Sequence, residues 1–232
     1  MKVAVLIDWE NLRRDLIYLQ NADPNFKEHF DYNKCSNIMT MIHSFLEKDE
    51  MLYRIFFYTA KPTNPADLKK KAESNSELSH YLENNQDQTE KMKCRFNKIN
   101  EFINNISYEK FVALRLGTLQ FKGIYYQRKN KQAKLNIVQK QVDMLLGLDI
   151  SHIAHNKLAD RLLIFCKDTD ILPSIKYARL NGLHVALAHL TGETQAGIHI
   201  APKLKVHSDD VRIQKTKDII DLITSTSSSH HI

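Results

Sequence analysis

Short apolar runs separated by stretches with helical spacing dominate this sequence. The runs at 2–7, 162–166 and 185–189 consist mainly of aliphatic and β-branched residues, and an aspartate follows the first of them at once. Continuous apolar runs of this length are typical of parallel strands that are buried on both faces. Parallel strands need long crossover connections, which are usually helices. The pattern therefore predicts a three-layer α/β fold with a central, mainly parallel sheet.

The intervening stretches place apolar residues three and four positions apart, as amphipathic helices do. Residues 61–107 are rich in Lys, Asn, Glu and Gln, with too few apolar positions for a core of their own. We interpret them as a two-helix insertion in one domain at 1–223, followed by a disordered tail at 224–232. We expect helices at 10–19, 35–46, 135–155, 171–180 and 210–223, a turn at 23–25, and further strands at 52–59, 111–116 and 123–126.

The composition indicates the compartment and the kind of partner. The formal net charge of +6 favours an anionic partner. The three cysteines include no CxxC pair, which argues against a disulfide framework or a zinc knuckle and for a reducing cytoplasm. No apolar run approaches the roughly 20 residues that span a bilayer, and the N-terminus lacks a signal-peptide cleavage region. We expect a cytoplasmic protein with no membrane partner.

Acidic residues stand where the predicted strands end. Asp8 ends the first strand, Asp168 and Asp170 follow the strand at 162–166, and Asp143 lies in the helix before that strand. Ligands of parallel sheets bind at the carboxyl ends of the strands. If the two strands are neighbours, these carboxylates converge, and they stay ionised together only around a cation. Oxygen ligands of this kind suit Mg²⁺ or Mn²⁺ better than zinc.

Each of these residues also has a structural alternative. Asp8 could cap the helix that follows it, and Asp170 could cap the helix at 171–180. Asp143 could be a solvated helix residue, and Asn11 only a polar residue in a first helical turn. Capping and metal binding are compatible, so both kinds of role stay open.

Four segments carry short motifs in a fixed order. They are VLIDWENL at 5–12, RLG at 115–117, KQVDMLLGLD at 140–149 and FCKDTDILP at 165–173. In order and spacing they resemble the hhhDxxN, R-x-G, K-G-V-D-x-x-x-x-x-D and S-G-D-S-D-F-x-P motifs of NYN domains, the PIN-like nuclease relatives that include LabA-like proteins. The resemblance covers roughly residues 1–60 and 110–223, and the insertion at 61–107 has no counterpart.

This resemblance implies a PIN-like, Rossmannoid fold and metal-dependent hydrolysis of RNA phosphodiester bonds. Asp149 is a lesser candidate for the acidic set. Two positions depart from the family pattern, because Gln141 and Lys167 each stand where the family has Gly. Lys167 could bind phosphate, or it could signal altered or lost metal binding. The implied catalytic set comprises four metal-binding acids and one amide, which are Asp8, Asp143, Asp168, Asp170 and Asn11.

A basic stretch with interleaved aromatics spans 110–142. It holds no acidic residue, and its eight positive charges exceed the net charge of the whole chain. A local positive excess favours a phosphate backbone, and aromatics can stack on unpaired bases. The alternative is a solvated loop with core aromatics. Tyr125 and Tyr126 would point to opposite sides of a strand, so we expect at most one to be available. The expected RNA-binding residues are Arg115, Lys122, Arg128, Lys129, Lys131, Lys134, Lys140, Lys167 and Tyr126.

Together these features predict a metal-dependent ribonuclease that acts on single-stranded or structured RNA and is compatible with a homo-oligomer. No arrangement of Ser, Cys or His indicates a covalent nucleophile. One alternative is a non-catalytic RNA-binding or scaffold domain. Another is a phosphohydrolase of the HAD type with Asp8 as nucleophile, although Glu10 stands where its usual second aspartate would be.

Overall fold

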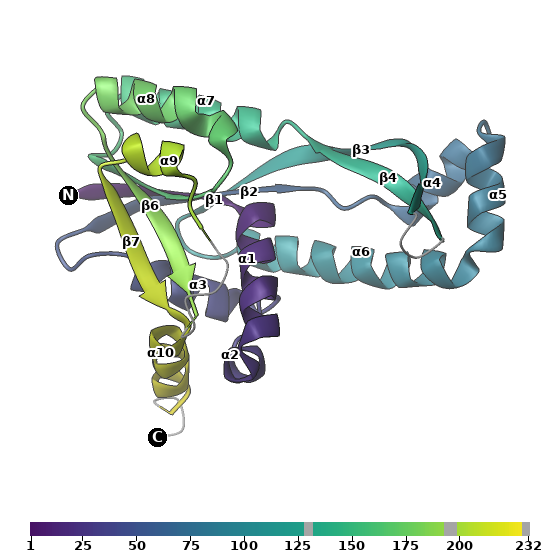
Figure 1. The fold of residues 1–232 in the computed structure, drawn as a ribbon, viewed down its shortest axis with the longest axis horizontal. Helices are drawn as coiled ribbons and strands as arrows, with labels where there is room; N and C mark the ends of the chain where they lie inside the picture. Colours follow the sequence, from purple (N-terminus) through teal and green to yellow (C-terminus); the bar gives the residue numbers. More distant parts are fainter. Residues whose placement is uncertain (128–131, 193–198, 229–232) are drawn as a thin grey trace.

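The computed structural model describes residues 1–127, 132–192 and 199–228, with side chains up to residue 225. Within these ranges the strands form one seven-stranded sheet in the order β4-β3-β2-β1-β5-β6-β7 (Figure 1). Neighbouring strands run parallel except for β3 and β4, which confirms the predicted fold class. The strands are β1 (Lys2–Asp8), β2 (Met51–Ala60), β3 (Val112–Gln127), β4 (Gln132–Lys140), β5 (Arg161–Phe165), β6 (His184–Thr191) and β7 (Asp210–Lys215).

Helices cover both faces of the sheet. They are α1 (Trp9–Ala22), α2 (Pro24–His29), α3 (Cys35–Ser44), α4 (Pro65–Ala72), α5 (Ser76–Asn84), α6 (Gln86–Ser107), α7 (Val142–His155), a short 3-10 turn η1 (Thr169–Ile171), α8 (Leu172–Leu180), α9 (Pro202–Val206) and α10 (Thr216–Ser228). Figure 1 shows α7 and α8 on one face and α1, α3 and α10 on the other. Among the described residues, no helix combines the length and the apolar character that crossing a lipid bilayer requires.

The central strand β1 contributes to two separate cores. Val3, Val5 and Ile7 pack into the core beneath α1 and α3, whereas Ala4 and Leu6 pack into the core beneath α7 and α8. All five residues are fully buried. Both side-chain rows of the strand therefore need apolar residues, which explains why this run does not alternate with polar ones.

The strand order reverses between β1 and β5. The chain adds β2 and β3 on one side of β1, then crosses back to add β5, β6 and β7 on the other. Ile7 of β1 lies opposite Phe165 of β5, so these two strands are neighbours, as convergence of the acids requires. In open α/β sheets the carboxyl ends of two such strands form a crevice in which ligands bind. Asp8 and the residues that follow Phe165 occupy this position.

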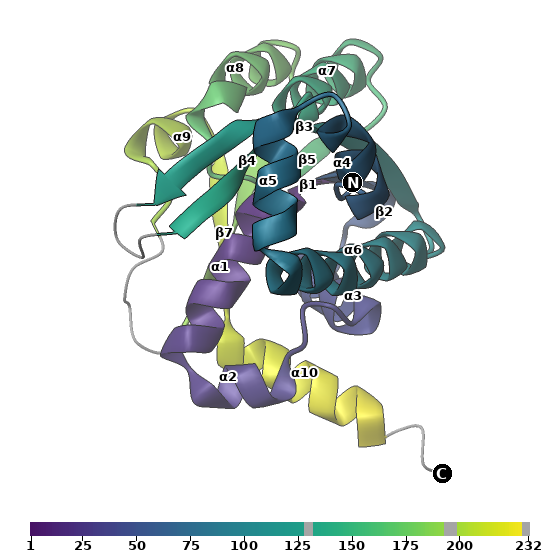
Figure 2. The ribbon, with the colours of Figure 1, turned by 90° about the vertical axis from the view of Figure 1, so that its right-hand side faces the viewer.

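One hairpin continues past the carboxyl edge of the sheet. The pairing of β3 with β2 ends where Gly117 meets Ala60, and from Thr118 onward β3 pairs only with β4. At about 3.3 Å per residue, the segment 118–127 projects roughly 30 Å beyond the sheet. We call the hairpin formed by residues 118–127 and 132–140 the arm. Figures 1 and 2 show that it extends away from the sheet alongside α4, α5 and α6.

Two predicted helices are partly strands. Residues 135–140 belong to β4, and the helix expected from 135 begins only at Val142. Residues 210–215 form β7, and the helix expected from 210 begins at Thr216. In both stretches the spacing of apolar residues is compatible with either element. Pairing with β3 and with β6 decides the outcome, because tertiary pairing overrides a local pattern.

Smaller expectations also need correction. The strands expected at 111–116 and 123–126 are one strand with a bulge between Phe121 and Gly123. The insertion at 61–107 holds three helices instead of two. The expected turn at 23–25 opens α2, where Asp23 accepts hydrogen bonds from two backbone N–H groups. The predicted tail at 224–232 is helical to Ser228, and 229–232 lie outside the described residues.

A buried ion network joins the segment before β2 to β5 and β7. The side chain of Glu50 is fully buried and bridges Arg161 and Arg212, with N···O distances of 2.6 Å to each. Burial alone would raise the pKa of Glu50. Hydrogen bonds from Arg212, the Glu47 backbone and Arg161 overcome this effect and lower the pKa to about 2. Glu50 therefore stays charged in the folded protein and ties three strands together.

Candidate functional site

Asp8 lies at the end of β1 and at the N-cap of α1, with 2% of its surface exposed. Its Oδ1 accepts a hydrogen bond from the backbone N–H of Asn11 at 3.1 Å, and its Oδ2 accepts one from Nδ2 of Asn11 at 2.7 Å. Burial raises the pKa of Asp8, the bonds from Asn11 oppose this rise, and the charge of Asp143 adds to it. Asp8 thus caps a helix while holding a carboxylate in surroundings that disfavour its charge.

Asp168 and Asp170 follow β5 at the same edge of the sheet. Oδ1 of Asp168 accepts the backbone N–H of Asp170 at 2.9 Å and so caps the turn η1. The alternative in which Asp170 caps the next helix does not hold, because α8 has no side-chain cap. The Asp170 carboxylate is therefore not used to cap a helix.

Asp143 approaches these acids from α7. It lies in the first turn of that helix, directly after Gln141 and Val142. Asp143 is exposed. Partial desolvation of its carboxyl group still raises its pKa, and the charges of Asp168 and Asp170 raise it further. Asp143 in turn affects Asp8, so Asp143 lies within electrostatic reach of the other three predicted acids. Three segments that are distant in sequence supply this set together with Asn11.

Cys166 connects the two acidic strand ends, and sequence reasoning missed it. Its Sγ lies 3.8 Å from Oδ2 of Asp8 and 3.4 Å from the backbone nitrogen of Asp168. Burial raises the pKa of the Cys166 thiol well above its usual range, and the charge of Asp8 adds to the rise. The residue therefore remains a neutral thiol that can donate to Asp8. Its place at the end of a predicted central strand was a usable signal.

The donor chemistry of the four acids suits a hard divalent cation, since carboxylate oxygens are preferred ligands of Mg²⁺ and Mn²⁺. Their mutual repulsion also favours a cation among them. Over the described ranges, however, no three His, Cys, Asp or Glu side chains gather closely enough to hold a metal ion. The chemical type of these ligands thus fits the predicted metal. In the described structure their side chains are not close enough together to form a coordination sphere.

Gln141 adopts a left-handed backbone conformation at the start of α7. Its φ is 76°, a region that non-glycine residues rarely occupy, and its side chain does not cap the helix. The NYN-like motif described above has Gly at this position. The departure is therefore accommodated with local strain, and the turn that presents Asp143 is retained.

Asp149 and Arg115 bind each other instead of facing the acids. Oδ2 of Asp149 accepts hydrogen bonds from Nε of Arg115 and from the hydroxyl of Tyr58, both at 2.8 Å. The guanidinium group of Arg115 also lies over the ring of Phe56, 5.2 Å from its centroid. These contacts fasten α7 to β2 and β3. Both residues hold the helix that carries Asp143 in place.

Lys167 forms an ion pair with Asp15 of α1 and is largely buried. Burial lowers the pKa of Lys167, and the charge of Asp15 opposes that change. Asp15, four residues after Asn11 and so on the same side of the helix, was not expected at this edge. Because Lys167 is largely buried and already paired with Asp15, it is less available to bind a phosphate than its place beside Asp168 in the sequence indicates.

The other expected RNA-binding residues lie along the arm. Lys122 and Lys140 are exposed and Lys134 is half-buried. Tyr125 and Tyr126 are 47% and 61% exposed, so the expectation that at most one is available is wrong. Both rings are therefore accessible. Arg128, Lys129 and Lys131 lie outside the described residues.

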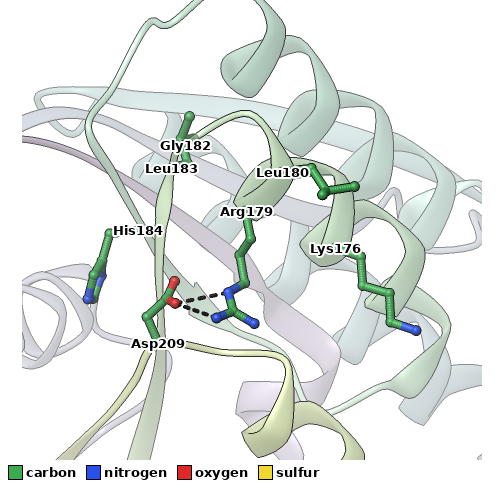
Figure 3. Close-up of a pocket in the computed structure, with 7 residues that line it drawn as sticks. All are labelled: Lys176, Arg179, Leu180, Gly182, Leu183, His184 and Asp209. Atoms are coloured by element: carbon green, nitrogen blue, oxygen red, sulfur yellow. Dashed lines mark hydrogen bonds and ion pairs between the residues drawn. The ribbon is translucent and has the colours of Figure 1, made fainter.

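A pocket of about 610 Å³ lies at the opposite edge of the sheet (Figure 3). It is lined by Lys176 and Arg179 of α8 and by residues at the amino ends of β6 and β7, among them Asp209. Arg179 pairs with Asp209 at 2.8 Å, and Asp209 also accepts the backbone N–H of Val185. Arg179 and Asp209 thus serve structural contacts, and the strand-end acids are not part of this pocket.

The geometry of Asp8 argues against a role as a covalent nucleophile. Both of its oxygens accept hydrogen bonds, and the residue is almost completely buried. An attacking carboxylate needs an open line to phosphorus. Glu10, at the second position of the HAD motif, forms ion pairs with Arg13 and Arg14 instead.

Comparison of the chain with models of known families, with curated proteins and with solved structures finds no match. What this site can do therefore follows from its own residues and from the sheet edge at which they meet.

Proposed function

We propose that this protein hydrolyses phosphodiester bonds of RNA at the edge formed by Asp8, Asp143, Asp168 and Asp170. One observation carries the proposal. At the point where the strand order reverses, Asp143 is affected by the charges of Asp168 and Asp170 and in turn raises the pKa of the buried Asp8. An acidic cluster at this crevice is costly to the folded chain, and a cation offsets the cost. A metal site that catalyses hydrolysis would explain why the chain keeps these mutually repelling carboxylates together.

The four acids would hold Mg²⁺ or Mn²⁺. When bound, such an ion lowers the pKa of a coordinated water and stabilises charge on a phosphate. The protein's own residues prepare the site. Asn11 fixes both oxygens of Asp8, the thiol of Cys166 donates to it, and Gln141 orients the first turn of α7, which bears Asp143.

The partner in this proposal is RNA, and the compartment is the cytoplasm. The lysines of the arm provide the positive charge that a phosphate backbone recognises. Cys35, Cys94 and Cys166 are all free, which fits a reducing environment. Lys167 contributes mainly through its pair with Asp15, and we assign it a positioning role.

The decisive experiment measures cleavage of a labelled single-stranded RNA in Mn²⁺ by the wild type and by Asp8→Asn. Asn can still cap α1, so the fold should survive, while cleavage should fall by roughly 100-fold. A matched control is Asp23→Asn. Asp23 caps α2 in the same manner but lies at the other end of α1. The control should retain full activity.

Three outcomes would redirect the proposal. Full activity in Asp8→Asn would rule out the assigned site. A wild type that binds RNA but never cuts it, whichever divalent metal is added, would favour a non-catalytic RNA-binding domain. A phosphorylated enzyme after brief exposure to a phosphate monoester would favour the HAD mechanism.

A further inference from the structure

The arm has two chemically different faces. In an antiparallel pair, directly opposite residues point to the same side. One side carries the pairs of Leu119 with Gln139, Phe121 with Ile137 and Ile124 with Leu135. The other side carries the pairs of Thr118 with Lys140, Gln120 with Val138 and Tyr125 with Lys134. We call the second side the polar face of the arm.

The apolar side is the one that the insertion can cover. Leu119, Phe121 and Ile124 are partly buried, whereas Thr118, Gln120 and Tyr125 are exposed. Helix α5 contacts β3, and its own Leu78 and Tyr81 are buried. Figure 2 shows α5 and α6 grouped on one side of the hairpin. The insertion thus supports the arm from one side and leaves the polar face to solvent.

The polar face leads directly to the acidic cluster. Its innermost pair, Thr118 with Lys140, adjoins Gln141, and the hydroxyl of Thr118 lies 3.4 Å from Oε1 of Gln141. Asp143 follows two residues later in the first turn of α7. A ligand lying along this face toward the sheet would therefore arrive at Asp143.

We propose that the polar face of the arm binds a single unpaired nucleic-acid strand and leads it to Asp143. That the strand is RNA rests on the function proposed above. Lys134 and Lys140 lie six residues apart on β4, or about 20 Å at 3.3 Å per residue, so they can contact phosphates several nucleotides apart on one strand. The side chains between them on this face are mainly small or amide groups. The ring of Tyr125, 47% exposed and directly opposite Lys134, offers a plane for stacking one base.

An unpaired strand fits this surface better than a duplex does. Stacking on Tyr125 requires a base whose face is free, and the bases of a duplex are stacked on one another. The polar face is also a two-stranded ribbon with one exposed ring and few charges. Recognition of double-stranded RNA depends instead on contacts with its shape across two minor grooves.

The test measures binding alone, in the Asp8→Asn background without metal, so that it does not depend on cleavage. Fluorescence anisotropy would follow a labelled RNA strand and its duplex. Tyr125→Ala should weaken binding of the single strand by about tenfold, the scale of one lost base stack. Lys134→Gln should weaken it and reduce the salt dependence, by roughly 0.7 in slope for one phosphate contact.

Matched controls come from the same molecule. Tyr126→Ala removes the adjacent and more exposed ring, which lies on the opposite side of the arm. A strand on the polar face would not reach this ring, so Tyr126 leaves the set of RNA-binding residues that the sequence led us to expect. Lys110→Gln removes a lysine before β3. Both should bind like the parent. A thermal melt of each variant confirms that the arm is still folded.

The outcomes separate this inference from the proposed function. Equal losses for Tyr125→Ala and Tyr126→Ala, or duplex bound as tightly as single strand, would overturn the assignment of the polar face. Arm-dependent binding of a single strand by a wild type that never cuts it would uphold the arm and contradict the nuclease. Single-stranded DNA bound as tightly as RNA would uphold the face and show that it reads the backbone and bases without the 2′-hydroxyl.

Discussion

Gly117 of β3 and Val142 of α7 pack so closely that no side chain fits between them. A Cβ atom at position 117 would lie 2.6 Å from Cγ2 of Val142 and 2.5 Å from the carbonyl oxygen of Lys140. Asp143 is the next residue along the helix. Gly117 therefore sets how near α7, and with it this acid, can come to the sheet.

We predict that Gly117→Ala destabilises the protein by about 1–3 kcal/mol, as overpacking does, and lowers metal-dependent cleavage because Asp143 moves outward. Gly182→Ala, between α8 and β6, is the control. It meets no atom within 4 Å but strains a φ of +83°. It should cost stability without altering cleavage measured below the melting temperature. Equal cleavage by both variants would contradict the positional role of Gly117.

Gln141→Gly should stabilise the protein by roughly 0.5–1 kcal/mol, since glycine adopts a left-handed conformation without the steric penalty. The increase would be read from the urea midpoint. Gln141→Ala keeps the Cβ atom and should give no such gain. A destabilised glycine variant would mean that the side chain of Gln141 contributes more than its strain costs.

Two aspartates of α7 should respond oppositely to the same substitution. Asp143→Asn removes a charge that its neighbours disfavour, so the metal-free protein should melt at a slightly higher temperature while cleavage is lost. Asp149→Asn weakens the bonds to Arg115 and Tyr58 and should cost about 1–3 kcal/mol. Thermal melts with and without Mn²⁺ distinguish the two. Only the Asp143 variant should lose the stabilisation that the metal provides.

Glu50 should make stability fall in acid. Its pKa is lowered from 4.5 to about 2 on folding, so the unfolded chain binds its proton first. The contribution of Glu50 is fully present above pH 4.5 and is lost as the pH falls toward 2. At about 1.4 kcal/mol per pKa unit it amounts to roughly 3 kcal/mol. Urea midpoints of the wild type and Glu50→Gln across this range should converge as the pH falls, and a constant difference would refute the assignment.

The sheet interior was the part of the fold most open to sequence reasoning. Both side-chain rows of β1 and β5 are buried, so their sequences carry a continuous apolar signal. The edge strands β4 and β7 are only partly buried and have mixed patterns. Their sequences fit a helix equally well, and only the neighbouring strand determines their conformation. The prediction of secondary structure failed at β4 and β7, where the spacing of apolar residues permits a helix but pairing with a neighbouring strand favours a strand.

For the site, position along the strands was enough to select Asp8, Asp168 and Asp170. The sequence ranked Asp149 below Asp143 but could not indicate its partners, because Arg115 and Tyr58 come from distant strands. The ion pair between Lys167 and Asp15 could not be predicted either, because the two residues lie far apart in the sequence. A motif shows which residues gather at an edge, whereas contacts between distant segments decide which of them remain free to act.

The order of strands in the sheet has a further consequence for the arm. Strand β4 lies at one end of that order, so in the described part of the chain one of its edges faces no other strand. Open edges invite pairing with a second copy, and lysines on an edge strand oppose it. Lys134 and Lys140 thus disfavour self-association of the arm when no RNA is bound. Phosphates that neutralise them would remove this protection, so aggregation that increases with RNA loading is the expected liability of such an arm.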